Sequence, residues 1–206
     1  MNRFKLILGI LFVTGCSITP QTHTEIVTYN FATYIPGNID HATQASINNS
    51  KKILVAPIAA PSWLDSHDMH YRLAYHNPRR SYTYAHSRWS SSPAFLLAQQ
   101  IKQKITDYTP HLVITDNSTV VADNKLFIEL EEFSQVFDSE HDSHIMIRYR
   151  ANLVNNAHQL IAQRVFNTLE TSSTADARGA ADAFSTANNR LLDDLIQWLQ
   201  AELNKV

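Results

Sequence analysis

Hydrophobic and polar residues alternate most regularly between His144 and Leu153. The apolar positions there are Ile145, Ile147, Tyr149, Ala151 and Leu153, and polar or flexible side chains stand between them. A period of two puts successive side chains on opposite faces of a strand, so this pattern predicts a strand with one buried and one wet face. Residues 126–137 and 160–169 are also strand-like and are separated from it by polar turns. The three segments together predict an antiparallel meander.

Shorter runs of β-branched and aromatic residues predict further strands earlier in the chain. A buried strand is expected to end at Pro57, because proline cannot continue a ladder of backbone hydrogen bonds. A hairpin is expected around a turn at His76-Asn77-Pro78. The segments expected to be extended are residues 26–34, 52–57, 71–75, 81–84 and 111–115.

Two segments have the spacing of helices. Ser92 followed by Pro93 is a strong helix start, and apolar residues then recur every three or four positions to about Asp107. The second helix follows Ser173 and Asp176, which have the spacing of a capping box with aspartate in place of glutamate, and continues to Leu203. Gly179 is expected to let this helix pack closely on the sheet. Strands, helix, strands and long helix predict an α+β fold, with a mixed or antiparallel sheet packed by two main helices in a single domain.

The N-terminus has the pattern of a secretory signal. Two positive charges precede an apolar run from Leu6 to Val13, which is too short to span a bilayer, and small residues lead to Cys16. Val13-Thr14-Gly15-Cys16 resembles the lipobox of bacterial lipoproteins, which implies acylation of Cys16 and cleavage before it. We therefore expect a signal peptide at 1–15, a lipidated tether at 16–24 and a folded domain at 25–206. Ser17 resembles the sorting residue of outer-membrane lipoproteins that face the periplasm.

Composition narrows the function classes. Removing residues 1–15 takes away Arg3 and Lys5, so Lys+Arg falls from 17 to 15 against 19 Asp+Glu, and the net charge moves from −2 to −4. This balance argues against nucleic-acid binding, which needs a basic face. Cys16 is the only cysteine, so a disulfide within one chain is excluded.

Polar clusters offer only weak candidates for chemistry. Two histidine-containing groups invite a metal hypothesis, but they fall in expected loops and lack an established metal motif, so polar loop residues are the favoured interpretation. A glutamate group on a strand is better explained as a solvated face than as a glycosidase pair. No serine has the Gly-x-Ser-x-Gly setting of a hydrolase. We expect no catalytic residue, metal or cofactor; the residues considered are Asp65, His67, Asp68, His70, His141, His144, Glu129, Glu131 and Glu132.

Aromatic side chains are concentrated between residues 63 and 89. Tyr and Trp combine a large apolar area with a polar tip, which suits both cores and binding surfaces. Trp89 is expected inside the domain, whereas Trp63 and one or two tyrosines are candidates for the surface. The members of the cluster are Trp63, Tyr71, Tyr75, Tyr82, Tyr84 and Trp89.

Several segments together resemble the ABC-type transport auxiliary lipoprotein component family, which includes PqiC-like lipoproteins. The resemblance covers residues 25–203 and is carried by the order and spacing of the motifs and by the lipobox. The matching segments are Ile53-Leu54-Val55-Ala56-Pro57, Ala60-Pro61-Ser62-Trp63-Leu64, Tyr71-Arg72, Tyr84, Arg88-Trp89, Pro93-Ala94-Phe95-Leu96-Leu97, Leu126 to Phe137, Arg148-Tyr149-Arg150-Ala151-Asn152-Leu153, Ala180-Ala181-Asp182-Ala183-Phe184 and Leu195-Ile196-Gln197-Trp198-Leu199.

The resemblance implies a non-enzymatic protein. It would be a docking component of an ABC system that moves lipids between two membranes, with an MCE-domain protein, an ABC permease and its ATPase as partners, and with assembly into a homo-oligomer left open. From their chemistry, the residues expected to contact a partner or lipid are Trp63, Tyr71, Arg72, Tyr75 and Arg88.

Two other functions stay open at this point. One is an envelope-assembly lipoprotein for lipopolysaccharide or outer-membrane components. The other is a lipid-anchored periplasmic hydrolase, which predicts a deep pocket with strongly perturbed carboxylates or a His–Ser pair. Docking instead predicts an exposed aromatic patch without such a pocket.

Overall fold

A computed structural model describes residues 25–32, 50–114 and 118–205 of the chain. The signal peptide at 1–15, Cys16 and the rest of the tether at 16–24 lie outside the described residues. The elements are β1 (Val27–Tyr29), β2 (Lys52–Val55), β3 (Asp68–Leu73), β4 (Asn77–Trp89), α1 (Pro93–Tyr108), β5 (Leu112–Ile114), β6 (Asn124–Phe137), β7 (Ser143–Asn155), β8 (Leu160–Thr171) and α2 (Ala177–Leu203).

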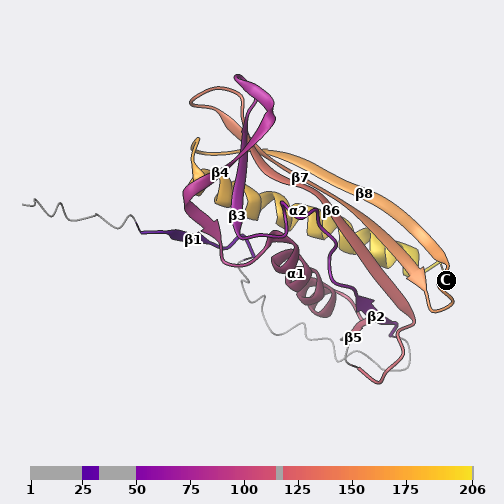
Figure 1. Ribbon diagram of the computed structural model, residues 1–206. Helices are drawn as coiled ribbons and strands as arrows, with labels where there is room; N and C mark the ends of the chain where they lie inside the picture. The colour runs from indigo at the N-terminus through magenta and orange to yellow at the C-terminus, as the bar shows by residue number, and fades with distance from the viewer. Residues whose placement is uncertain (1–24, 33–49, 115–117, 206) are drawn as a thin grey trace, which may run out of the picture.

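The long strands β6, β7 and β8 form the predicted antiparallel meander (Figure 1). All five apolar positions of β7 are fully buried, with 0% exposure, so its alternation correctly identified the core-facing side. One irregularity interrupts the β6–β7 ladder between Leu130 and Glu132. Glu131 is therefore an extra residue on β6, and a bulge of this kind bends the strand and re-aims side chains.

The other edge of β6 is divided between two strands. β2 pairs in parallel with the start of β6, at Asn124 to Leu126, and β3 pairs in parallel with its end, at Gln135 to Phe137. β5 continues the sheet beyond β2, whereas β4 and then β1 continue it beyond β3. The described residues thus form a mixed sheet of eight strands with two helices, and the predicted α+β class is confirmed.

Both helices contribute to the core beside the sheet, and α2 runs along β7 and β8 (Figure 1). The predicted start of α1 is confirmed: the Ser92 hydroxyl accepts a hydrogen bond from the Phe95 N–H at 3.4 Å, and Pro93 is the first helical residue.

The Tyr149 hydroxyl of β7 donates to the Leu191 carbonyl of α2 at 3.1 Å. Burial raises the pKa of this phenol, because ionisation in the core would be costly.

The start of α2 differs from the expectation in two respects. Asp176 itself is the N-cap, with an extended backbone and a carboxylate that accepts the Gly179 N–H at 2.8 Å. Ser173 therefore does not cap the helix, because the N-cap is the residue directly before the first helical residue, which is Ala177. Gly179 faces the backbone of Thr174 in the preceding loop, and this close approach, not the sheet, is what excludes a side chain there.

Several strand boundaries also differ. β2 ends at Val55 and not at Pro57, and β3 covers residues 68–73 where residues 71–75 were expected. β1 ends at Tyr29 and does not run to residue 34, because the Asn30 side chain accepts the Ala32 N–H at 2.8 Å and turns the chain locally; residues 33 and 34 lie outside the described residues. The hairpin turn lies at residues 74–76, so β4 already begins at Asn77, and β4 is much longer than residues 81–84.

An aromatic cluster joins the hairpin to the rest of the core. The Phe133 ring stacks on Phe184 of α2 with centroids 4.1 Å apart. Trp89 of β4 and Phe31 both pack against Phe133, at 5.7 and 4.8 Å. Trp89 is only 1% exposed, which agrees with its predicted place in the core.

Candidate binding surface on the hairpin

The β3–β4 hairpin carries most of the residues expected to bind a partner. In Figure 1 it extends past both helices, together with the β6–β7 turn. Tyr71 lies opposite Tyr82 in the ladder, and Arg72 lies opposite Ser81. Because adjacent residues of a strand point to opposite faces, the hairpin separates these two predicted residues from each other.

One face of the hairpin is a tyrosine layer. Tyr71 stacks on Tyr82 at 5.3 Å and contacts Tyr84 at 4.8 Å and Phe137 at 5.6 Å. The Tyr84 hydroxyl donates to the buried Gln135 amide oxygen at 2.7 Å. Burial, and then the nearby Asp176 carboxylate, raise the pKa of Tyr84. Tyr71 therefore belongs to a packed layer and is half-buried.

The opposite face carries Arg72. Its guanidinium donates to a Glu132 carboxylate oxygen at 3.0 Å and to the Ser134 hydroxyl at 3.3 Å. The side chains of Arg72 and Glu132 are 29% and 15% exposed, so the pair is partly shielded from water. The second Glu132 oxygen is buried and has no hydrogen-bond partner in the part of the chain that the structure describes. The charge of Arg72 is thus compensated within the protein.

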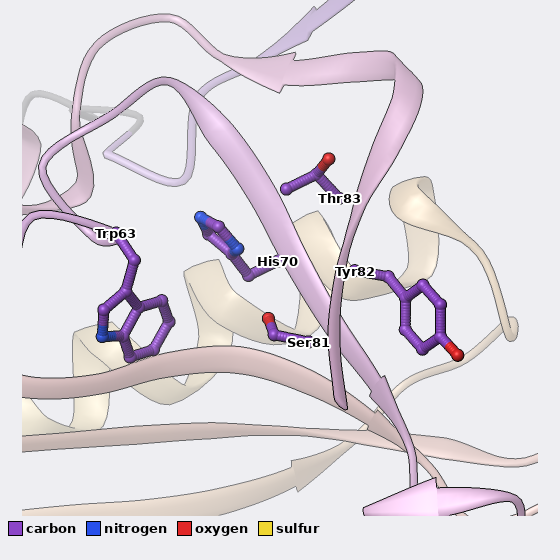
Figure 2. Close-up of a pocket in the computed structure, with 5 residues that line it drawn as sticks. All are labelled: Trp63, His70, Ser81, Tyr82 and Thr83. Atoms are coloured by element: carbon purple, nitrogen blue, oxygen red, sulfur yellow. The ribbon is translucent and has the colours of Figure 1, made fainter. Parts of the chain in front are cut away.

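A hollow of about 460 Å³ lies on the same face as Arg72. Its lining residues are Trp63, His70, Ser81, Tyr82 and Thr83. Figure 2 shows the His70 ring between Trp63 and Thr83, Ser81 beside them, and the Tyr82 ring pointing away on the other side of β4. The rings of Trp63 and His70 meet edge to face, with centroids 5.2 Å apart. Trp63 is 39% exposed, so its expected place at the surface agrees with the structure.

The remaining predicted residues lie at the two ends of the hairpin. Tyr75 is in the turn and is 48% exposed. Arg79 and Arg80 follow it at the exposed start of β4, and the Arg80 guanidinium lies 4.7 Å from the Tyr82 ring centroid. Arg88 is exposed near the other end of β4, opposite Asp68. The five predicted residues are therefore spread over both faces and both ends of the hairpin.

The other polar candidates are mostly engaged in ordinary contacts. In the described parts of the chain, no three His, Cys, Asp or Glu side chains come together as a group that could hold a metal ion. Glu131, displaced by the bulge, pairs with Arg148 and Arg150 at 2.6 Å each. His144 lies 2.7 Å from an Asp138 oxygen. These side chains form exposed or half-exposed pairs on the outer face and in the β6–β7 turn.

The hollow does not have the contacts of a hydrolytic site. Although His70 and Ser81 both line it, no hydrogen bond joins them within the described residues, and the buried Nε2 of His70 has no partner. A serine nucleophile needs a base within hydrogen-bond reach and a third group that orients the base. Sequence reasoning missed Ser81 and Thr83, because hydroxyl residues on a strand carry no signal of their own.

The comparisons with known proteins agree with the fold and the sequence motifs. The model of the ABC-type transport auxiliary lipoprotein component family matches residues 38–195, well over half of the chain. The chain belongs to this family. The family is one of auxiliary lipoproteins of ABC-type transport systems, and it is not a known enzyme family. No curated protein matches the chain.

Solved structures share the fold at low sequence identity. Protein XCC0632 from Xanthomonas campestris, of family DUF330, has a TM-score of 0.73 at 20% identity, over 87% of this chain and 97% of that one. An uncharacterised protein has a TM-score of 0.64 at 12% identity, over 85% and 99% of the two chains. The hypothetical protein CT253 from Chlamydia trachomatis has a TM-score of 0.52 at 11% identity, over 74% and 97%. Neither helix in the described part of this transport auxiliary lipoprotein is long and apolar enough to cross a bilayer.

Proposed function

We propose that this transport auxiliary lipoprotein docks an MCE-type ABC system that moves lipids between the two membranes of the cell envelope. Acylated Cys16 would hold it at the membrane, on the periplasmic side and in the outer membrane. Its partners would be an MCE-domain protein and the ABC permease with its ATPase. The observation that carries the proposal is the family match over residues 38–195.

The projecting hairpin is the surface best suited to meet a partner. Tyr75 at its turn is 48% exposed, and tyrosine is enriched among interface residues that carry binding energy. Arg79 and Arg80 are exposed beside it, and neither makes an ion pair within the described residues. Trp63, Tyr71, Arg72 and Arg88 would support or flank this contact at the two faces and the base of the hairpin.

The tether length is compatible with docking close to the membrane. Glu25 lies nine positions after Cys16 in the sequence. At roughly 3.3 Å per residue, an extended segment of that length reaches about 30 Å. The domain would therefore stay near the bilayer surface, where it could meet a machine that spans the space between the membranes.

Co-purification from solubilised membranes tests the proposal. The wild-type protein is expected to recover an MCE-domain protein and ABC subunits. Tyr75→Ser should reduce this recovery roughly tenfold, which corresponds to the loss of about 1.4 kcal/mol of binding energy. Tyr108→Ser is the matched control, because Tyr108 is a 59% exposed tyrosine on α1, away from the hairpin.

The outcomes separate the parts of the proposal. Failure of the wild type to recover any MCE or ABC component would reject the transport role, and recovery of lipopolysaccharide or outer-membrane assembly proteins would favour the envelope-assembly alternative. Equal recovery by Tyr75→Ser and Tyr108→Ser would reject the hairpin as the docking surface. Cys16→Ser should release the protein from the membrane fraction and leave [3H]palmitate unincorporated; if it fractionates like wild type, the anchor assignment is wrong.

A further inference from the structure

We propose that the hollow beside Trp63 binds a neutral polyhydroxylated ring, such as a hexose unit of a glycan or of a glycolipid headgroup. This inference goes beyond the docking role and does not depend on it. It is drawn from the polar groups, the aromatic ring and the charge of the lining residues Trp63, His70, Ser81, Tyr82 and Thr83.

The hollow contains one buried polar atom without a partner. The Nε2 atom of His70 is buried and makes no hydrogen bond to any residue that the structure describes. An unpaired buried polar atom is destabilising, so this nitrogen is a natural point of contact for a ligand. Ser81 and Thr83 line the same hollow as exposed residues of β4, and their hydroxyls make no hydrogen bond within the described residues.

A hydroxyl group is the partner that fits these atoms best. It can both donate and accept, so it matches His70 Nε2 in either tautomer and also matches the two side-chain hydroxyls. Ser81 and Thr83 stand two residues apart on β4, and His70 lies opposite Thr83 on β3. All three side chains therefore point to one face of the hairpin, where several hydroxyls of one ring could reach them together.

Trp63 supplies the apolar side of the hollow. The face of an indole ring carries the negative part of its quadrupole, which attracts the partly positive C–H hydrogens on the apolar face of a sugar ring. Its contact with His70 at 5.2 Å holds the indole at the edge of the hollow. Because the side chain is 39% exposed, a ligand can approach it from solvent.

Charge and size argue for a neutral ligand. Among the residues that the structure describes, the lining contains no Asp, Glu, Lys or Arg. Arg72 follows on the same face of β3, but it is paired with Glu132 at 3.0 Å, so it is not free for a phosphate. The volume of about 460 Å³ is within the range of about 300–1,000 Å³ that is typical of small-molecule sites.

Titration of the full mature chain with simple glycosides tests the proposal. The chain carries Cys16→Ser, because this change removes the lipid acceptor and leaves residues 25–205 intact. The probes are methyl β-D-glucopyranoside and methyl β-D-galactopyranoside. Their binding is measured by tryptophan fluorescence and by saturation-transfer NMR. Trp89 and Trp198 are buried, at 1% and 7% exposure, so a change in fluorescence reports mainly on Trp63. We expect saturable binding of at least one probe with a Kd of about 1 mM, which is the strength of a small single-ring contact.

Variants check that binding occurs in the hollow. Trp63→Ala and His70→Phe should each weaken binding at least tenfold, and His70→Phe preserves a flat ring against Trp63 while removing the nitrogen atoms. Phe127→Ala is the matched control, because Phe127 is a 42% exposed aromatic residue on β6 outside the lining. Circular dichroism of each variant establishes that it is folded. Unchanged affinity in folded Trp63→Ala and His70→Phe would overturn the proposal, as would equal loss in Phe127→Ala.

Further probes identify the source of the ring and exclude other ligands. Tighter binding of n-octyl β-D-glucoside, below its micelle concentration, than of the methyl glycoside would indicate a glycolipid headgroup, and equal binding would indicate a free glycan; both support the proposal. Binding of octyl tetraethylene glycol with the same affinity as the octyl glucoside would show an alkyl site and overturn it. So would competition by inorganic phosphate, or the absence of binding by both methyl glycosides at about 50 mM, well above the expected Kd.

Discussion

Replacing Gly179 by alanine should destabilise the protein, although helix propensity alone predicts the opposite. Alanine is more favourable than glycine by about 0.8–1.0 kcal/mol in a helix interior. A Cβ at residue 179, however, would lie well inside 3.0 Å of the Thr174 carbonyl oxygen and 2.7 Å from the Thr174 nitrogen. These are backbone atoms, which cannot rotate away as the end of a flexible side chain could.

The structure gives an order of magnitude for the net effect. Overpacking a tight site typically costs about 1–3 kcal/mol, and a clash with backbone belongs at the upper end. Subtracting the gain of about 1 kcal/mol in propensity leaves a net loss of about 2 kcal/mol. The loop from Thr174 to Asp176 would have to move, and this would also disturb the hydrogen bond from the Gly179 N–H to the Asp176 carboxylate.

Urea denaturation followed by circular dichroism measures the change in the free energy of unfolding. Thr186→Ala is the control, because Thr186 is exposed on the same helix and the substitution raises helix propensity without such a contact. The control should be neutral or slightly stabilising. If Gly179→Ala were as stable as wild type or more stable, the argument from the Thr174 contact would be wrong.

Three further sets of substitutions test the cap, the ion pair and the aromatic core. Asp176→Ala should lower the free energy of unfolding by about 1 kcal/mol, whereas Asp176→Asn, an equally good cap, should keep most of it. The Gly179 N–H lowers the pKa of Asp176 below its ordinary 3.8, so the unfolded state takes up the proton first. Wild type should therefore lose stability as the pH falls below 3.8. Urea titrations at pH 3 and pH 6 should show a smaller difference in unfolding free energy for Asp176→Asn, because this variant lacks the contribution of the Asp176 carboxylate. Arg72→Ala should cost about 1–2 kcal/mol, between an exposed and a buried pair, and added Glu132→Gln should recover part of it in thermal melts; no recovery would contradict the pairing. Phe133→Ala should cost about 3–5 kcal/mol in the same melts, and a loss under 1 kcal/mol would contradict its central place in the core.

The sequence revealed those parts of the fold that depend on local pattern. β7 was recognisable because Ile145 and its apolar partners repeat with a period of two, and α1 because Ser92 and Pro93 combine two start signals. The cap of α2 was misjudged because Ser173 and Asp176 are both competent caps, and only the backbone conformation decides between them. The partners of β6 were not predictable, since parallel pairing with β2 and β3 depends on contacts between segments far apart in the chain.

The candidate site was only partly accessible for the same reason. Trp63 stood out by its chemistry, but its contact with His70 depends on a loop that returns to β3, and His70 was considered only as a metal ligand. The register that sets His70 opposite Thr83 is shifted by an irregularity between Asp68 and His70. No local pattern predicts such a shift, and it is this shift that brings the unpaired imidazole and the hydroxyls together.

The short strand β1 gives the protein a defined mechanical linkage. It is the first described strand, and it pairs in parallel with Ser87 to Trp89 of β4 through only three residue pairs. With the proposed anchor at Cys16, tension from the membrane would reach the described domain first at these three pairs, and then at Phe31, whose buried ring packs against Trp89 and Phe133. A pull strong enough to separate β1 from β4 would therefore load the aromatic core next, through the ring of Phe31.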